Sequence, residues 1–130
     1  MLTAALLATA LLFGGMVLYS FGFAAFLFTA LPPDVAGPTI RRAFPLFYLF
    51  VMATALVAML LIWRSDPIAA WLLGGIAATT LPTRQFLMPA VNRATDAGNR
   101  QRFQALHGLS VVITLAHIGA AGVVLARYVP

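Results

Sequence analysis

The 130-residue sequence contains no cysteine, no lysine and no glutamate, and its only acidic residues are Asp34, Asp66 and Asp96. Without cysteine the chain can form no disulfide, no zinc-thiolate site and no thiol nucleophile. It also lacks paired carboxylates, a nucleophile elbow, a glycine-rich phosphate loop and an HExxH metal motif. We therefore expect the protein not to be an enzyme.

Apolar residues are present in excess. Hydrophobic residues make up 62% of the chain and charged residues 8%, with a mean hydropathy of +0.98. These values lie outside the range of soluble globular domains and predict an integral membrane protein. The eight positively charged residues are all arginines, placed singly or in pairs beside apolar runs. That position suits lipid headgroups, so the basic net charge does not indicate nucleic-acid binding.

The apolar runs predict an all-α fold, an integral membrane four-helix bundle that forms a single domain over residues 1–130. Pro32 and Pro33 should end the first helix, Pro67 should open the third, and Pro82 should kink it. The first run lacks a basic leading segment, so we expect a retained helix rather than a signal peptide. The predicted spans cover about residues 2–31, 43–63, 68–88 and 103–126.

Arginines are distributed unevenly between the two ends of such a bundle. Arg64 and Arg127 would lie at one end. The other end would carry six that we expect to contact lipid headgroups: Arg41, Arg42, Arg84, Arg93, Arg100 and Arg102. Because cytoplasmic loops are enriched in positive charge, this bias predicts both termini outside the cytoplasm. We expect the membrane to be a bacterial inner membrane.

The fourth predicted span carries both histidines of the chain. At ~100° per residue, His107, Ser110, Thr114 and His117 fall within about 80° of arc and form a polar stripe. Polar groups in a membrane should face other helices, since hydrocarbon offers them no partners. The two histidines are about 15 Å apart along the helix axis, too far to share one haem.

His117 is expected near the middle of the membrane, at the depth of Met16 and Met52. Imidazole and thioether groups at one depth could bind Cu(I) or haem iron, which makes copper or haem handling one alternative function. A neutral His117 that is hydrogen-bonded to Ser20, Tyr19 or Thr54, with no cofactor, is the simpler interpretation.

Two further hypotheses come from the third and fourth spans. The kink at Pro82 and the charge of Arg84 could serve a small-solute carrier, although the chain has no intramembrane carboxylate for proton coupling. Small residues on the fourth span favour close helix packing instead. We therefore expect a non-enzymatic accessory or structural subunit of a larger membrane complex, or a homo-oligomer, whose partners are lipids and other membrane subunits or itself. The small residues are Ala116, Gly119, Ala120, Ala121 and Gly122.

Four features also form a recognisable combination: a long glycine-containing first helix, FPLFY at 44–48, a proline-bearing end of the third span, and RQRFQALHGLS at 100–110. Together they resemble the family of small four-helix membrane proteins that includes eukaryotic transmembrane protein 205 and bacterial domain-of-unknown-function relatives. The resemblance implies a four-helix integral membrane protein and brings no enzymatic activity with it.

Overall fold

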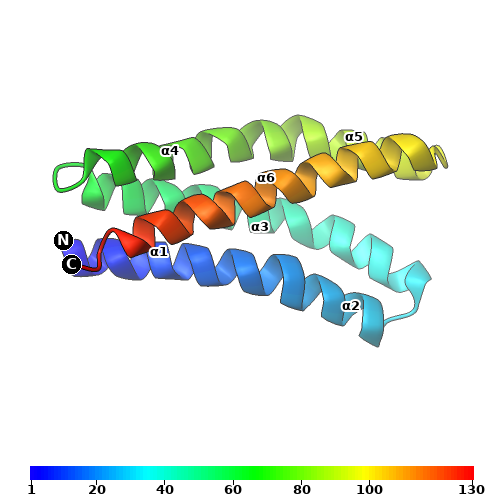
Figure 1. Cartoon of the computed structure of the whole chain (residues 1–130). Coiled ribbons are helices and arrows are strands. Elements are labelled where there is room, and N and C mark those ends of the chain that lie inside the picture. The colour runs from blue at the N-terminus through cyan, green and yellow to red at the C-terminus, as the bar shows by residue number, and fades with distance from the viewer.

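The computed structural model describes all 130 residues, which form helices and no strands. Four long helical rods run alternately up and down the bundle, and the two termini lie at the same end (Figure 1). The helical segments are α1 (Leu2–Val17), η1 (Leu18–Phe23), α2 (Ala24–Ala30), α3 (Pro33–Ile62), α4 (Pro67–Pro82), η2 (Thr83–Leu87), α5 (Met88–Asp96) and α6 (Arg100–Ala126). The first rod comprises α1, η1 and α2, and the third comprises α4, η2 and α5. The prediction of an all-helical bundle is confirmed.

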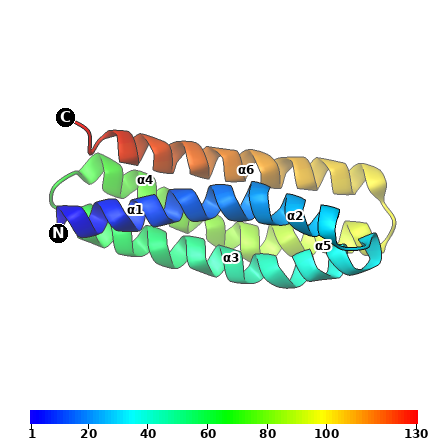
Figure 2. The ribbon, with the colours of Figure 1, turned by 90° about the horizontal axis from the view of Figure 1, so that it is seen from below.

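The helices are arranged so that α3 and α6 occupy opposite corners (Figure 2). α3 packs against α1 and α4, whereas α6 packs against α1, α4 and α5. The consequence is an uneven division of the core, because α3 contributes seven buried residues and α6 only three.

Burial is low for such an apolar chain, since only 24 of 130 residues are buried although 62% are hydrophobic. Large side chains such as Leu60, Trp71 and Phe86 lie on the outer surface. Water would strongly disfavour this surface, whereas lipid would not. The segments Leu2–Ala30, Pro33–Ile62 and Arg100–Ala126 are each long and apolar enough to cross a membrane.

The second rod begins ten residues earlier than the predicted span at 43–63. α3 starts at Pro33, where the missing amide donor costs nothing because the first helical amides have no intrahelical partner. Asp34 lies in the first turn, near the positive end of the helix dipole. Pro38 and Pro45 are both accommodated inside the helix, so the predicted start of the second span at residue 43 is wrong.

The third rod also extends further than predicted, past residue 88 to Asp96. Only a short turn at 97–99 separates it from α6, although the predicted spans left residues 89–102 outside any helix. Gly98 in this turn has a φ of 66°, which favours glycine. The side chain of Asn99 then caps α6 by accepting from the Arg102 amide at 3.1 Å. The fourth helix therefore starts at Arg100 rather than 103.

Both interrupted rods contain a π-helical segment. In the third rod, η2 follows Pro82 directly, and the Thr83 hydroxyl donates to the Thr79 carbonyl at 2.9 Å. At Pro82, where a kink was predicted, the structure has this π-helical segment. In the first rod η1 has no proline to mark it, and the sequence analysis did not predict it.

Candidate functional site

His117 is joined to the neighbouring helix by a hydrogen bond to Thr79. Its Nε2 lies 2.7 Å from Oγ1 of Thr79 on α4, and the same hydroxyl donates to the Gly75 carbonyl at 2.7 Å. A hydroxyl has one proton to donate, so Nε2 is the donor in this contact when the Thr79 proton goes to the Gly75 carbonyl, and the acceptor when that proton goes to Nε2.

The three partners expected for His117 are engaged elsewhere. The Tyr19 hydroxyl donates to the Ala43 carbonyl and the Thr54 hydroxyl to the Phe50 carbonyl, while the Ser20 hydroxyl is buried without a partner. The specific partners named from the sequence are therefore wrong.

The proposed metal or haem ligands are not brought together by any described contact. Met16 is buried in the hydrophobic core, whereas Met52 is only partly buried and lies outside the core cluster. No group of three or more His, Cys, Asp or Glu side chains gathers in the protein. The hydrogen bond to Thr79 occupies Nε2 of His117, so a ligand on that nitrogen would have to displace Thr79. Copper or haem binding by His117, Met16 and Met52 stays a prediction.

The polar stripe on α6 is divided between two environments. Ser110 is buried and donates to the His107 carbonyl at 2.7 Å, and Thr114 and His117 are partly buried. His107 is exposed and stacks on Phe103, with ring centroids 5.3 Å apart. Three of the four polar residues thus point toward the bundle, and His107 does not.

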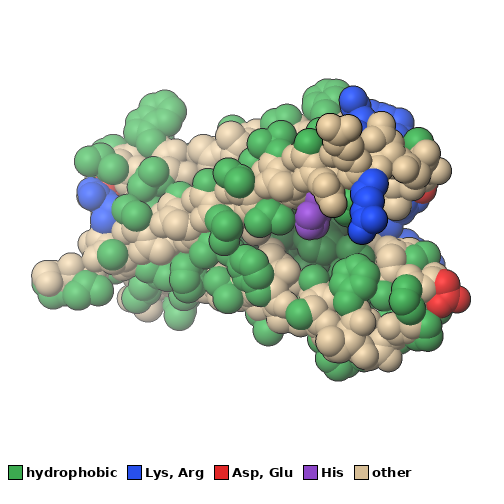
Figure 3. Space-filling view, turned by 45° about the vertical axis from the view of Figure 1, so that its right-hand side comes forward, with side chains coloured by type: hydrophobic (Ala, Val, Ile, Leu, Met, Phe, Trp, Pro, Cys, Tyr) green, Lys and Arg blue, Asp and Glu red, His purple; other side chains and the backbone are tan.

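Arginines occupy both ends of the bundle, and the sides between the ends are mainly apolar (Figure 3). At the end opposite the termini, Arg41 on α3 pairs with Asp96 on α5 at 2.9 Å. Arg42, Arg93, Arg100 and Arg102 are exposed there. Arg84 lies deeper and is partly buried, and its Nε donates to the Pro45 carbonyl at 3.1 Å. Its Nη1 donates to Gln85, so Arg84 links η2 to α3 as well as carrying charge.

The end that carries the termini holds an arrangement that the sequence analysis missed. Asp66 caps α4 by accepting from the Ala69 amide and pairs with Arg127 at the end of α6 through contacts of 2.6 and 2.8 Å. The Arg127 guanidinium, donating to the Asp66 carboxylate, lowers the pKa of Asp66. Beside this pair lies a cavity of about 660 Å³. Asp66 and Arg127 are 61 positions apart, and nothing in the sequence pairs them.

Apolar outer surfaces, long apolar helices and charges confined to the ends define the class of protein, a helical integral membrane bundle. Within this class the chain belongs to the family described as a domain of unknown function, DUF4149, whose sequence pattern matches residues 7–100. The match begins five residues into α1, continues through the first three rods and ends at the first residue of α6. No curated protein and no solved structure matches the chain.

Proposed function

We propose that this protein is a non-enzymatic integral membrane protein that acts by association, as an accessory subunit of a larger membrane complex or as a homo-oligomer. The observation that carries the proposal is an exposed stripe of small residues along α6. Its small members are all exposed, and the exposed valines Val112 and Val123 continue the same spacing of three and four; the small members are Ala105, Gly108, Ala116, Gly119 and Ala126.

The stripe is available to another molecule because nothing in the chain covers it. A Cβ added at Gly108 or Gly119 would meet no atom within 4 Å. On the inner side of the same helix, a Cβ at Gly122 would lie 3.4 Å from the Phe13 ring. The small-residue surface predicted from the sequence is therefore divided, with Ala121 and Gly122 facing the bundle and Ala116 and Gly119 facing outward.

Small residues on an outward-facing helix surface favour helix association in lipid. Apolar side chains gain little by leaving hydrocarbon, so membrane helices associate through close backbone packing, which small residues permit. The stripe thus favours a helix of a second membrane protein or of a second copy as its occupant.

The test is native mass measurement of the full chain in mild detergent, comparing wild type with Gly119→Ile. We expect the wild type to run above its 13.9 kDa chain mass and the variant to lose the added mass. Gly14→Ile is the matched control, because Gly14 is also exposed with nothing within 4 Å but lies on α1. A wild-type 13.9 kDa monomer without a co-purifying partner would overturn the proposal.

The proposal includes a location and an orientation. We place the protein in a bacterial inner membrane with the arginine-rich end in the cytoplasm and both termini outside, because positive charge favours the cytoplasmic side. Membership of a domain-of-unknown-function family supports that part of the resemblance, and we propose the relation to transmembrane protein 205 on the same motifs. Since the chain has no cysteine, a single cysteine at Asn99 or Ser65 allows a direct test with an impermeant thiol reagent. Labelling of Asn99→Cys by reagent added outside the cell would show that the orientation is the opposite of the one proposed.

A further inference from the structure

The first rod and α6 are in contact near the chain termini and diverge toward the arginine-rich end. Near the termini, a Cβ built on Gly122 of α6 would lie 3.4 Å from the Phe13 ring of α1. Further along, α6 packs against α4, η2 and α5 while α2 packs against α3, and α2 and α6 make little contact with each other (Figure 1). Figure 3 shows a hollow where the rods diverge, with hydrophobic side chains inside it and a histidine and an arginine at its rim.

One strip of α6 forms a wall of this opening. Its part near the termini is packed, since Gly122 faces Phe13 and Ile118 lies against the hydrophobic core. Residues at intervals of three, four and seven share one face of a helix. At these intervals the strip continues into four exposed residues: Val111, His107, Gln104 and Arg100. The strip is therefore mostly polar, and uncovered, at the level where the first rod has diverged.

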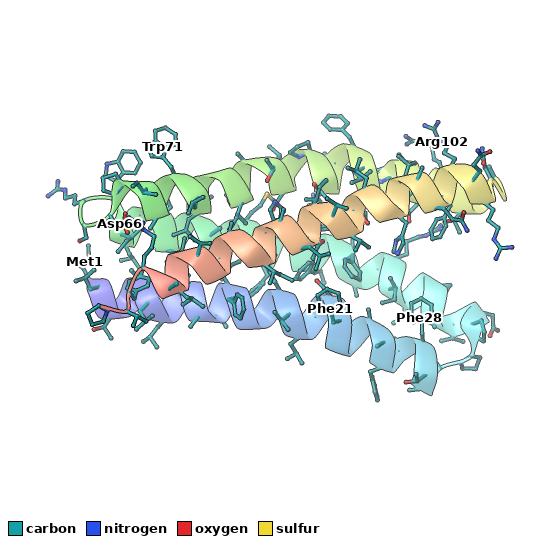
Figure 4. All side chains as sticks on the ribbon, viewed as in Figure 1. Met1, Phe21, Phe28, Asp66, Trp71 and Arg102 are labelled. Carbon is teal, nitrogen blue, oxygen red and sulfur yellow. The ribbon has the colours of Figure 1, made fainter.

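The facing strip of the first rod is apolar throughout. It begins at Phe13 and continues at intervals of four, four and seven as Val17, Phe21 and Phe28. The exposed fractions of these last three rise along the rod, from 37% to 48% and 59%. Phe21 and Phe28 lie on the part of the rod that diverges from α6 (Figure 4). The opening thus has an apolar wall on the first rod and a mostly polar wall on α6.

The polar part of the α6 strip lies at the level of one layer of lipid headgroups. His107 is 20 residues from Arg127, or about 30 Å along the helix axis, which is the thickness of the hydrocarbon core. Trp63 is exposed at the Arg127 end, and exposed indoles mark the boundary of the hydrocarbon there. Val111 lies one turn deeper than His107, within the hydrocarbon. A molecule in the opening would place a polar group beside His107 and Arg100 and an apolar part beside Val111.

The charge at this end favours a negatively charged polar group. Six arginines lie there with only two carboxylates, those of Asp34 and Asp96. Asp96 is paired with Arg41, and Asp34 lies in the first turn of α3. Neither Arg100 nor His107 forms an ion pair. A phosphate would find N–H donors on the α6 strip, whereas a cationic headgroup would find no carboxylate on it.

We propose that the opening between the first rod and α6 binds an anionic phospholipid, such as phosphatidylglycerol, from the leaflet at the arginine-rich end. Its phosphate accepts hydrogen bonds from the Arg100 guanidinium and the His107 imidazole. Its acyl chain lies between Val111 and the apolar wall of the first rod. The strip is on a different face of α6 from the stripe of small residues, so lipid binding and helix association can be tested separately.

The experiment titrates phosphatidylglycerol onto the full chain in mild detergent and measures bound lipid by native mass spectrometry. Phosphatidylcholine and phosphatidylethanolamine of equal chain length test the net charge of the headgroup. Glycerol phosphate, which has no acyl chain, tests whether the apolar part is needed. We expect phosphatidylglycerol to bind at least about tenfold more tightly than the other three.

Two matched pairs of variants locate the site. Arg100→Gln should weaken phosphatidylglycerol binding about fivefold, and Arg102→Gln should change it less than about twofold. Val111→Trp fills the opening and should also weaken binding about fivefold, whereas Leu109→Trp should not. Each control lies two residues from its counterpart, about 200° around the helix. All four side chains are exposed, so we expect every variant to fold.

The outcomes that would overturn the proposal differ in kind. Equal affinities for phosphatidylglycerol and phosphatidylcholine, or for glycerol phosphate, would show that the opening does not select an anionic lipid. Equal losses within either pair of variants would show that the lipid binds elsewhere. An added protein mass that is lost in Arg100→Gln, in place of lipid, would show that a second copy or another subunit occupies the opening.

Discussion

α3 and α6 are similar as sequences and different as parts of the bundle. Their most apolar windows have mean hydropathies of 2.4 and 2.2, yet 33% of the α3 window and 17% of the α6 window are buried. The two helices differ in the contacts made by the glycines at their surfaces. Cβ atoms built at Gly15 and Gly74 would lie 2.6 Å from the Phe50 ring and 2.9 Å from the Met59 sulfur, both on α3. Side chains of α3 fill the space beside the glycines of the neighbouring helices. Nothing in the chain fills the space beside the glycines on the outer face of α6. Hydropathy predicts that both helices cross the membrane. The glycine contacts distinguish α3, which packs within the bundle, from α6, whose outer face is uncovered.

Truncating a large side chain on each helix should show the difference between α3 and α6 most clearly. Phe47 on α3 is buried and stacks on Tyr19 with ring centroids 4.7 Å apart. Phe47→Ala should cost about 3–5 kcal/mol of unfolding free energy, because it removes packing and leaves a cavity. Leu115→Ala on the exposed side of α6 should cost less than about 0.5 kcal/mol. Both are measured by denaturant titration in mixed micelles with tryptophan fluorescence. Equal losses would mean that α6 is as much a core helix as α3.

Adjacent glycines on α1 give a sharper version of the comparison. Gly15→Ala places a Cβ against the Phe50 ring, which must shift, and should cost about 1–3 kcal/mol. Gly14→Ala meets open space and should be neutral or slightly stabilising through helix propensity. The same titration checks both variants. If Gly14→Ala were the more damaging of the two, the close approach of α1 to α3 would not hold.

The sequence predicted the class of fold because hydropathy and charge spacing are local properties. It placed the start of the second helix poorly where proline was taken as a break, because Pro33 opens α3 and Pro38 lies inside it, whereas Pro45 lies inside the helix as predicted. In lipid a helix interrupted by proline still satisfies most backbone groups internally, and leaving the helix would expose more of them. Membrane helices therefore tolerate proline better than the rule from soluble proteins suggests.

The polar contacts were harder to predict because they join distant positions. Thr79 and His117 are 38 positions apart, and the choice of Thr79 over Thr54 depends on which helix faces α6. α4 does and α3 does not, a fact of bundle order that periodicity does not encode. Asp66 and Arg127 each read as an ordinary interfacial residue until the helix ends are brought together.

The hydrogen bond between α4 and α6 offers a smaller effect. Thr79→Val removes the hydroxyl that contacts His117 and should cost about 1 kcal/mol, as typical of side-chain hydrogen bonds in membrane proteins. Thr54→Val is the control, since the Thr54 hydroxyl bonds only to carbonyls of its own helix. Denaturant titration of both variants measures the difference. A larger loss in Thr54→Val would show that the contact to His117 contributes nothing to stability.

The smallest effect concerns the ion pair that closes α6 onto α4. Arg127 lowers the pKa of Asp66, so the folded chain binds a proton here less readily than the unfolded chain. The resulting stability is present above the unfolded pKa of Asp66 and is lost as the pH falls through its folded pKa.

Asp66→Asn keeps an amide oxygen to cap α4 but removes the charge, so its unfolding should depend less on pH in this acidic range. Asp96→Asn is the counterpart at the other end, where the pair with Arg41 is more exposed, and it should change the profile less. Thermal unfolding followed by tryptophan fluorescence between neutral and acidic pH gives the profiles. Identical profiles for wild type and Asp66→Asn would show that the Asp66–Arg127 pair does not help hold α6 in place.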